Sequence, residues 1–489
     1  MLQRRIDAAQ IFRDLDWFTI LLYLLMVAAG VISIYAASYD YDNADVLDFA
    51  EFSGKQALWI SLSLGLGFFI LIIDTRMYEA YAYPIYVVIM LLLLITPFLA
   101  PDIKGSRSWL VFGPVSLQPA EFAKFATALA LAKLFSSYNF ILNAKMSNYA
   151  RAVGIIVLPI ILILAQRETG SALTFLALFF VLYREGMSGL ILFAALFAVV
   201  IFVVTVKFTT PMILGMEAGQ FWIILATMGT ILVMLFVYNR RWVVVRNVIS
   251  AYIIFILTLI ILTKFCGVHV NGMPVFLSFI GLTCAYLIFE ALHKRTFGLY
   301  IPTATAILSI AFMFSVNFAF DHLQPHQQLR IKVVLGLEDD IRGAGYNVNQ
   351  SKIAIGSGGL TGKGFLNGTQ TKLKYVPEQH TDFIFCTIGE EEGFIGTTAV
   401  MALFVALILR VIFLSERQPT TFGRVYGYCV ASYLIFHFCI NIGMVIGLCP
   451  VIGIPLPFFS YGGSSLWGFT ILLFILLRID AGRKQVMAY

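Results

Sequence analysis

Residues Gly343 to Asp382 read GAGYNVNQSKIAIGSGGLTGKGFLNGTQTKLKYVPEQHTD, a polar stretch between long runs of apolar residues. Eight glycines lie between Gly343 and Gly368, and the next apolar run begins directly after Asp382. Five lysines and arginines between Ile341 and Thr381 are accompanied by one acid, Glu378. This excess of positive charge favours a negatively charged ligand.

The chain around this stretch has the composition of a protein that crosses a membrane many times. Of its 489 residues, 60% are hydrophobic and 12% are charged, and its mean hydropathy is +0.89, so polar residues are too few to cover a soluble core. Because about 20 apolar residues cross a bilayer as a helix, the sequence predicts fourteen spans. They are residues 17–37, 56–73, 83–100, 119–135, 150–166, 169–184, 188–207, 220–238, 246–264, 275–292, 299–318, 383–409, 425–446 and 461–478.

Positive charges in the short loops predict the orientation of these spans. With a cytoplasmic N-terminus, lysines and arginines collect in the cytoplasmic loops, for example at Arg240, Arg241 and Arg246, as membrane proteins prefer. The charged segment before Trp17 does not resemble a cleavable signal peptide, so we expect the first span to be retained. An even number of spans places both termini in the cytoplasm and 321–382 outside, as one long loop.

A loop of that length is uncommon in a compact protein unless it is functional. Its apolar spacing predicts short helices over Leu329 to Leu337 and over Gln350 to Ile355, the second ending at Gly356. We therefore expect an all-α membrane protein in which this partly ordered loop folds over a membrane cavity.

Charged residues within the spans are the first candidates for a functional site, since they are costly in a membrane. Glu121 and Lys124 lie three residues apart on one helix face, close enough to pair. They form either a neutralised structural pair or part of a cavity lining. The cluster Gln166, Arg167 and Glu168 lies between two spans, where it either extends the same network or anchors the chain at the membrane surface.

Asp382 is the candidate for a catalytic carboxylate. It precedes a long apolar run, follows Glu378 and His380, and ends the basic glycine-rich stretch. One interpretation is a helix cap, because an aspartate accepts hydrogen bonds from free N–H groups at a helix start. The other is a general base at the boundary between water and lipid, where partial desolvation raises a carboxylate pKa.

Two further segments have polar groups at membrane depth. Glu390, Glu391 and Glu392 cannot all face one side of a helix, so at least one should contact a cation or water. Asn441 to Ser465 reads NIGMVIGLCPVIGIPLPFFSYGGSS, with too many prolines and glycines for an unbroken helix. Broken backbone at that depth requires protein groups or a cavity to receive it, so we expect it beside Asp382.

The cysteines predict neither disulfides nor a zinc site, because none of the spacings is C-x-x-C. We interpret them as small apolar residues of the spans. They are Cys266, Cys284, Cys386, Cys429, Cys439 and Cys449.

Three segments together resemble the SEDS family of polytopic cell-wall proteins (shape, elongation, division and sporulation). They are Gly105–Lys124 (GSRSWLVFGPVSLQPAEFAK), Gly343–Gly396 and Asn441–Ser465, about a quarter of the chain. GKGFLNGTQ and PEQHTDFIF are more similar to the elongation members than to the division members. The resemblance implies a peptidoglycan glycosyltransferase that polymerises lipid II during cell elongation, in the bacterial cytoplasmic membrane with its active site facing outward. It also implies a class B penicillin-binding protein and the elongation machinery as partners, and no nucleic acid.

The resemblance also assigns residues. It places the family's essential aspartate at Asp382 and its buried pair at Glu121 and Lys124. The family commonly has Gln-Pro-Asp where this chain has Gln166-Arg167-Glu168. Other residues expected to line the cavity or bind the lipid-linked diphosphate are Arg107, Glu168, Arg330, Lys352, Lys363, Glu378, His380, Ser460 and Ser464. A divalent cation, magnesium or manganese, is a candidate cofactor.

The family usually has ten spans, so 188–292 is predicted to insert about four more. The expected organisation is then N-terminal spans over 1–187, the insertion, one span over 293–320, the glycine-rich loop over 321–382 and C-terminal spans over 383–489. Three alternative functions remain: a lipid II flippase, a non-catalytic scaffold for a penicillin-binding protein, and a role in division.

Overall fold

The computed structural model describes residues 12–39, 52–103, 105–113, 115–238, 242–267, 270–323, 325–338 and 345–483. The chain divides into two compact units. The first comprises Met1–Met187 and Ile341–Tyr489, and the second comprises Ser188–Asp340. Because Asp382 and the buried pair belong to the first unit, that unit holds the candidate site.

The first unit is a bundle of helices with one small β-hairpin. Its elements in chain order are α2 (Trp17–Ser38), α3 (Phe52–Ile72), α4 (Thr75–Ala80), α5 (Ala82–Leu99), β1 (Leu110–Phe112), β2 (Val115–Leu117), α6 (Pro119–Phe135), η1 (Leu142–Ala144), α7 (Met146–Ala165), α8 (Thr169–Thr174), η2 (Phe175–Ala177), α9 (Leu178–Arg184), α16 (Tyr346–Gly358), α17 (Thr369–Lys372), α18 (Ile384–Glu391), α19 (Gly393–Glu416), α20 (Thr421–Val445) and α21 (Gly463–Ala481). Strands β1 and β2 pair antiparallel, with Leu110 opposite Leu117.

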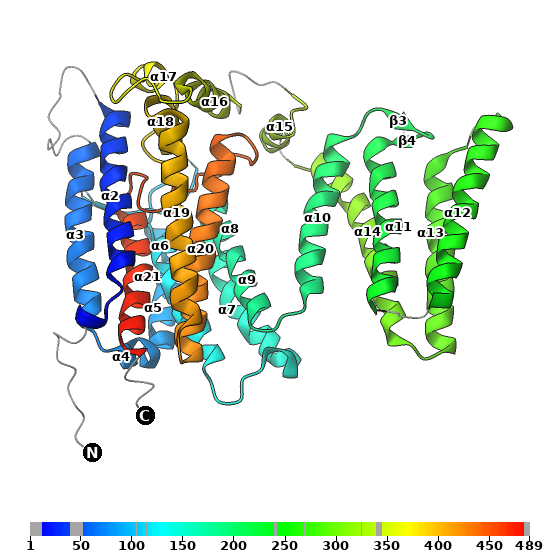
Figure 1. The fold of residues 1–489 in the computed structure, drawn as a ribbon, viewed down its shortest axis with the longest axis horizontal. Coiled ribbons are helices and arrows are strands. Elements are labelled where there is room, and N and C mark those ends of the chain that lie inside the picture. Colours follow the sequence, from blue (N-terminus) through cyan, green and yellow to red (C-terminus); the bar gives the residue numbers. More distant parts are fainter. Residues whose placement is uncertain are drawn as a thin grey trace. The chain divides into compact units, whose positions relative to one another are not determined.

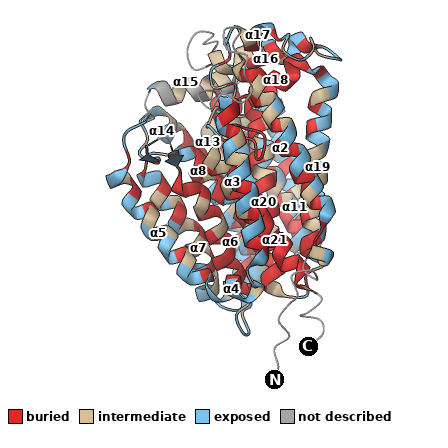
Figure 2. Ribbon diagram, turned by 90° about the vertical axis from the view of Figure 1, so that its left-hand side faces the viewer, coloured by how far each residue is buried: buried red, intermediate tan, exposed pale blue. Residues whose placement is uncertain are grey.

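Helix α21 is the centre of this bundle. Within its apolar window 89% of residues are buried, against 28% in α5. Figure 2 shows the buried residues following α6 and α21 while α5 is exposed over much of its length. Helix α6 packs against both α20 and α21, and its many alanines allow this close approach. Polar side chains of α6 therefore face protein rather than lipid.

The glycine-rich stretch covers one end of the bundle. Helices α16 and α17 lie there beside α18, at the end opposite to the start of α2 and the end of α21 (Figure 1). The predicted helix over Gln350 to Ile355 is confirmed as part of α16, but its predicted end at Gly356 is wrong, because the helix continues to Gly358. Expected loop residues 339–344 lie outside the described part of the chain.

The expected spans coincide with helices of the structure. Among the described residues, twelve helices are long and apolar enough to cross a membrane. The stretches over 119–135 and 169–184 are shorter: α6 has 17 residues, and the second is divided into α8, η2 and α9. The protein is therefore an all-α, multi-pass membrane protein.

One expected span has a different start. The prediction of a continuous helix over 383–409 is wrong, because α18 ends at Glu391 and α19 begins at Gly393. Gly393 has a φ of +64° and lies against the backbone of Gly362 in the glycine-rich stretch. The apolar composition of 383–409 hid this break. As a consequence, Glu390 and Glu391 lie outside the candidate span Gly393–Glu416.

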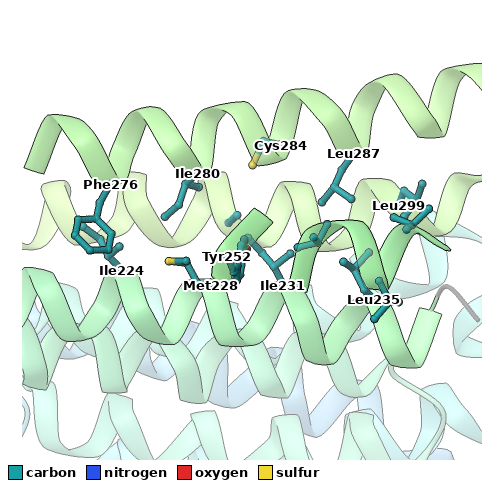
Figure 3. Close-up of a cluster of buried hydrophobic side chains, with 14 of the residues drawn as sticks. Ile224, Met228, Ile231, Leu235, Tyr252, Phe276, Ile280, Cys284, Leu287 and Leu299 are labelled. Atoms are coloured by element: carbon teal, nitrogen blue, oxygen red, sulfur yellow. The ribbon is translucent and has the colours of Figure 1, made fainter. Parts of the chain in front are cut away.

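The second unit has a hydrophobic core of its own. Its elements are α10 (Gly189–Lys207), β3 (Met212–Ile213), β4 (Met216–Glu217), α11 (Ala218–Tyr238), α12 (Trp242–Ile260), η3 (Ile261–Phe265), α13 (Gly272–His293), η4 (Phe297–Leu299), α14 (Tyr300–Asp321) and α15 (Pro325–Val334). Figure 3 shows Met228, Tyr252, Ile280 and Leu287 meeting between these helices. Helix α15 overlaps the helix predicted over Leu329 to Leu337, but it begins four residues earlier and ends three residues earlier.

Candidate functional site

The predicted pair of Glu121 and Lys124 forms in the interior of the bundle. Pro119 begins α6, which places both side chains on its first two turns. Lys124 Nζ lies 2.7 Å from Glu121 Oε1, and both side chains are almost fully buried. The ammonium also lies 4.8 Å from the centre of the Phe469 ring on α21, a distance that favours cation–π attraction. The buried charges therefore have partners, as their position in a membrane requires.

His437 on α20 is a third member of this group. Its Nε2 lies 3.0 Å from Lys124 Nζ, and its Nδ1 lies 3.1 Å from the carbonyl oxygen of Pro455. Because a lysine ammonium only donates hydrogen bonds, Nε2 must accept and Nδ1 must carry the proton donated to Pro455. The contacts thus assign the neutral tautomer of a fully buried histidine. His437 was not among the residues predicted from the sequence, although a histidine inside an apolar run was a usable signal.

Polar side chains form hydrogen bonds with the backbone of the broken segment between α20 and α21, as expected. Asn441 Nδ2 donates to the carbonyl oxygens of Ile454, at 2.7 Å, and Asp382, at 2.8 Å. Ser460 Oγ accepts from the backbone N–H of Leu456 at 2.8 Å. Asn441 and His437 lie one helical turn apart, so one face of α20 holds both the broken segment and the backbone of Asp382.

Asp382 lies in the turn that leads into α18. The N-cap of that helix is Phe383, whose side chain makes no capping hydrogen bond, and Asp382 directly precedes it. A Cβ built on Gly453 of the broken segment would lie 3.4 Å from Asp382 Oδ2, which confirms that the two segments are adjacent. The carboxylate is half-buried, partly desolvated yet open to a ligand.

Two other predicted residues of this turn, Glu378 and His380, are close to Asp382 along the chain. The His380 ring stacks on Phe52 of α3 with centres 4.2 Å apart, and its carbonyl oxygen accepts from Tyr461 N at 2.9 Å. The Glu378 carboxylate accepts from Thr381 Oγ1 at 3.3 Å. These contacts fix the turn against α3 and the segment before α21.

Glu168 extends the polar network at the start of α6, which was the first of the two interpretations of the cluster Gln166, Arg167 and Glu168. Its Oε1 accepts from Ser171 Oγ at 2.7 Å and from Gln118 Nε2. Gln118 immediately precedes α6, and its backbone N–H donates to Ser464 Oγ at 3.1 Å. Glu168 Oε2 is buried and has no hydrogen-bond partner among the described residues, so this carboxylate retains an acceptor directed into the protein.

The remaining predicted cations have different surroundings. Arg107 is exposed, 3.9 Å from Asp102, and its backbone N–H donates to Gln166. Lys352 is exposed on α16, with Nζ 2.6 Å from where a Cβ of Gly447 would lie. Lys363 pairs with Glu390 at 2.7 Å, which confirms that one of the three consecutive acids contacts a cation. The side chain of Arg330 lies outside the described part of the structure.

The described residues contain no group of three or more His, Cys, Asp or Glu side chains that could hold a metal ion. The described cysteines are all free thiols. Magnesium is commonly held by one or two carboxylates together with phosphate oxygens of a substrate. A divalent ion at Asp382 would therefore need a phosphate-bearing ligand to complete its coordination.

Comparison with known proteins agrees with this architecture. Residues 16–216 and 277–485 match the model of the cell cycle protein family of FtsW, RodA and SpoVE. The unmatched residues 217–276 contain α11, α12 and η3. The match covers well over half of the chain.

Individual relatives cover nearly the whole chain. The peptidoglycan glycosyltransferase RodA of Treponema pallidum is 28% identical over 470 residues, which cover 96% of this chain and 98% of the relative. The peptidoglycan glycosyltransferase MrdB of Escherichia coli K12 is 29% identical over 415 residues, 85% of this chain and 81% of the relative.

Solved structures share the fold. A chain from a study of the structural coordination of polymerization and crosslinking by a peptidoglycan synthase complex superposes with a TM-score of 0.59 at 23% identity, covering 96% of this chain and 99% of that chain. The rod shape determining protein RodA of Thermus thermophilus gives a TM-score of 0.51 at 22% identity, with 96% and 97% covered. With its family match, its membrane helices and its buried polar network, this chain belongs to the cell cycle protein family of FtsW, RodA and SpoVE.

Proposed function

We propose that this protein is a peptidoglycan glycosyltransferase that polymerises lipid II into glycan strands for cell elongation. The names of the relatives from Treponema pallidum and Escherichia coli support the activity, and the names RodA and MrdB favour elongation over division. The observation that carries the proposal is the position of Asp382. Its carboxylate is half-buried and lies against a broken segment anchored by His437 and Asn441.

In the proposed mechanism Asp382 acts as a general base. Its carboxylate takes the proton of the 4-hydroxyl of an acceptor sugar, and that oxygen forms a bond to the anomeric carbon of a second sugar. The bond from this carbon to the diphosphate oxygen breaks, and undecaprenyl diphosphate leaves with the electron pair. A general base of this kind contributes typically 10²–10⁴-fold to a rate.

Charge on the leaving diphosphate calls for nearby positive charge. Lys124 lies beside Glu121 and His437 in the interior of the bundle, and Lys352 is exposed on α16. Lys363 is the weaker candidate, because its ammonium already contacts Glu390 and Thr369 Oγ1. A magnesium or manganese ion on the diphosphate is a further proposed source of positive charge.

We further propose that the site faces the outer side of the cytoplasmic membrane, where a class B penicillin-binding protein cross-links the product. The solved relative from a study of polymerization and crosslinking supports such a partner. An outward site also fits the loop orientation that the positive charges predict.

The test is an assay of the purified full chain in vesicles containing lipid II, with and without a class B penicillin-binding protein. The proposal predicts glycan chains longer than the substrate on a gel. Movement of lipid II between leaflets without chain growth would instead favour a flippase. Absence of chain growth and of lipid movement in both preparations would favour a scaffold.

A further inference from the structure

Glu390 is the carboxylate around which the glycine-rich stretch folds. It is fully buried, and its Oε1 accepts from the backbone N–H groups of Thr369, at 2.8 Å, and Gln370, at 2.9 Å. Its Oε2 accepts from the N–H of Thr371 at 2.9 Å, and Lys363 Nζ lies 2.7 Å from Oε1. Three successive backbone amides at the start of α17 and one ammonium are thus directed at the Glu390 carboxylate.

These contacts keep Glu390 charged. Burial alone raises the pKa of a carboxyl group, but the hydrogen bonds from Lys363 and from the amides of Gln370 and Thr371 outweigh it and lower the pKa of Glu390 to about 2. At neutral pH the side chain is therefore an acceptor in all of these contacts.

The backbone of the same stretch is also bound to the junction of α18 and α19. Lys363 N donates to the carbonyl oxygen of Glu390 at 3.0 Å, and Gly364 N donates to that of Glu391 at 2.9 Å. In return Phe394 N donates to the carbonyl oxygen of Gly359 at 3.0 Å. This close contact requires Gly362, where a Cβ would overlap the Glu391 carbonyl oxygen.

One side chain connects α17 with the turn that holds Asp382. Gln379 is 4% exposed, and its Nε2 donates to the carbonyl oxygen of Thr371 at 2.8 Å and to that of Ala37, at the end of α2, at 2.6 Å. Gln379 precedes Asp382 by three residues, and the turn is closed by hydrogen bonds from the N–H groups of Thr381 and Phe383 to Glu378. The position of α17 therefore determines where this turn is held.

We propose that Glu390 is a positioning residue for Asp382: its carboxylate fixes α17, and α17 fixes the turn of Asp382 through Gln379. Glu390 also lies in α18, which begins two residues after Asp382. The Glu390 carboxylate thus connects α18, which follows Asp382, to α17, which holds the turn through Gln379. The catalytic part of this inference rests on the proposed function, in which Asp382 takes the proton.

The test compares Glu390→Gln and Gln379→Leu with the control Glu392→Gln in the full-length protein. Glu392 belongs to the same run of acids but is exposed. An amide in place of the Glu390 carboxylate directs an NH₂ group at one of the donors, and leucine in place of Gln379 removes both of its hydrogen bonds. Amide hydrogen exchange of residues 377–383, the melting temperature and the rate of glycan synthesis over pH are measured for each.

Both variants should raise exchange in the turn at least tenfold and lower kcat at least tenfold, with KM little changed. Their acid limb in the pH–rate profile should shift, since the surroundings of Asp382 change. The double variant should be no slower than the slower single variant, because both act on one route. Glu392→Gln should match the unmodified protein in exchange of the turn and in the rate of glycan synthesis.

Unchanged exchange in the turn would overturn the inference, whatever the rates. A loss of melting temperature with an unchanged pH profile and turn would do the same, since it would show a structural role alone. If Glu390→Gln does not fold, Gln379→Leu decides by the same criteria. An unmodified protein that makes no glycan would refute the proposed function, and with it the catalytic part of this inference, while exchange still decides whether Glu390 holds the turn.

Discussion

Lys124 Nζ lies 3.0 Å from His437 Nε2, in the interior of the membrane-spanning bundle. The same histidine also contacts the broken segment, since its Nδ1 lies 3.1 Å from the Pro455 carbonyl oxygen. One helical turn further along, Asn441 binds the carbonyl oxygens of Ile454 and Asp382. A buried charge pair and the candidate catalytic turn are therefore held by the same face of α20.

Replacing His437 tests this arrangement. His437→Ala removes the donor to the Pro455 carbonyl and one of the contacts of Lys124, which should lower the free energy of unfolding by about 1–3 kcal/mol and slow glycan synthesis. His437→Gln offers one acceptor and one donor, so it should be milder in both respects. Thermal unfolding and polymer yield measure the two effects. Equal losses in both variants would show that the hydrogen bonds are not what His437 contributes.

The pair of Glu121 and Lys124 allows structural and catalytic roles to be separated. Removing one partner leaves a buried charge, so Glu121→Gln or Lys124→Met alone should cost about 3–5 kcal/mol in stability. The double variant should recover most of that loss. Polymerisation should stay low in the double variant if the charge of Lys124 serves the leaving diphosphate. Recovery of both stability and rate would reduce the pair to a structural one.

The sequence predicted the parts of this site that depend on composition. Apolar length was enough to find the helices, and the cost of charge in a membrane was enough to find Glu121 and Lys124. Proline and glycine density located the broken segment beside Asp382. These features are local, and local physical chemistry decides them.

Other parts depend on distant contacts. The separation of α18 from α19 follows from the packing of Gly362 against Gly393, residues about thirty positions apart. The charge of Lys363 pointed to a ligand in the sequence, yet in the structure it contacts Glu390. The role of His437 required knowing that Lys124 and Pro455 lie on either side of it. No periodicity contains this information.

Glycine positions in the stretch offer a matched pair of substitutions. Gly362→Ala should disrupt the loop, because φ is +78° there and a Cβ would overlap the backbone of Glu391. Gly356→Ala should be neutral or stabilising by up to about 1 kcal/mol, since its Cβ would meet open space in helix α16. Limited proteolysis should cleave the loop faster in Gly362→Ala than in Gly356→Ala, and polymer yield should be lower in Gly362→Ala. Similar behaviour would show that the loop does not depend on this close contact.

The two buried acids at the end of α18, Glu390 and Glu391, predict opposite effects of pH on stability. Burial, followed by repulsion from Glu392 and Glu390, raises the pKa of Glu391 to about 7 despite a backbone hydrogen bond from Leu366. The stability that its neutral form gives is present below its ordinary pKa and is lost as pH rises through about 7. Glu391→Gln should therefore stabilise the protein by about 1–3 kcal/mol at pH 8 and change little at pH 4.5.

The stability that Glu390 contributes depends on pH in the opposite direction. Its pKa is lowered to about 2, so its contribution is present above its ordinary pKa and is lost as pH falls toward 2. Melting temperatures between pH 3 and pH 8 should show both effects in the unmodified protein. A Glu391→Gln variant whose pH dependence equals that of the unmodified protein would contradict the assignment of Glu391.

The most direct test of the account is the rate of glycan synthesis on lipid II by purified Asp382→Asn, measured beside the unmodified protein and the control Glu392→Gln. Asparagine keeps the size of the side chain but cannot take a proton from the acceptor sugar. The account predicts a loss of at least a hundredfold in kcat with an unchanged melting temperature, and near-normal synthesis by Glu392→Gln. Full activity of Asp382→Asn would contradict the assignment of Asp382 as the general base.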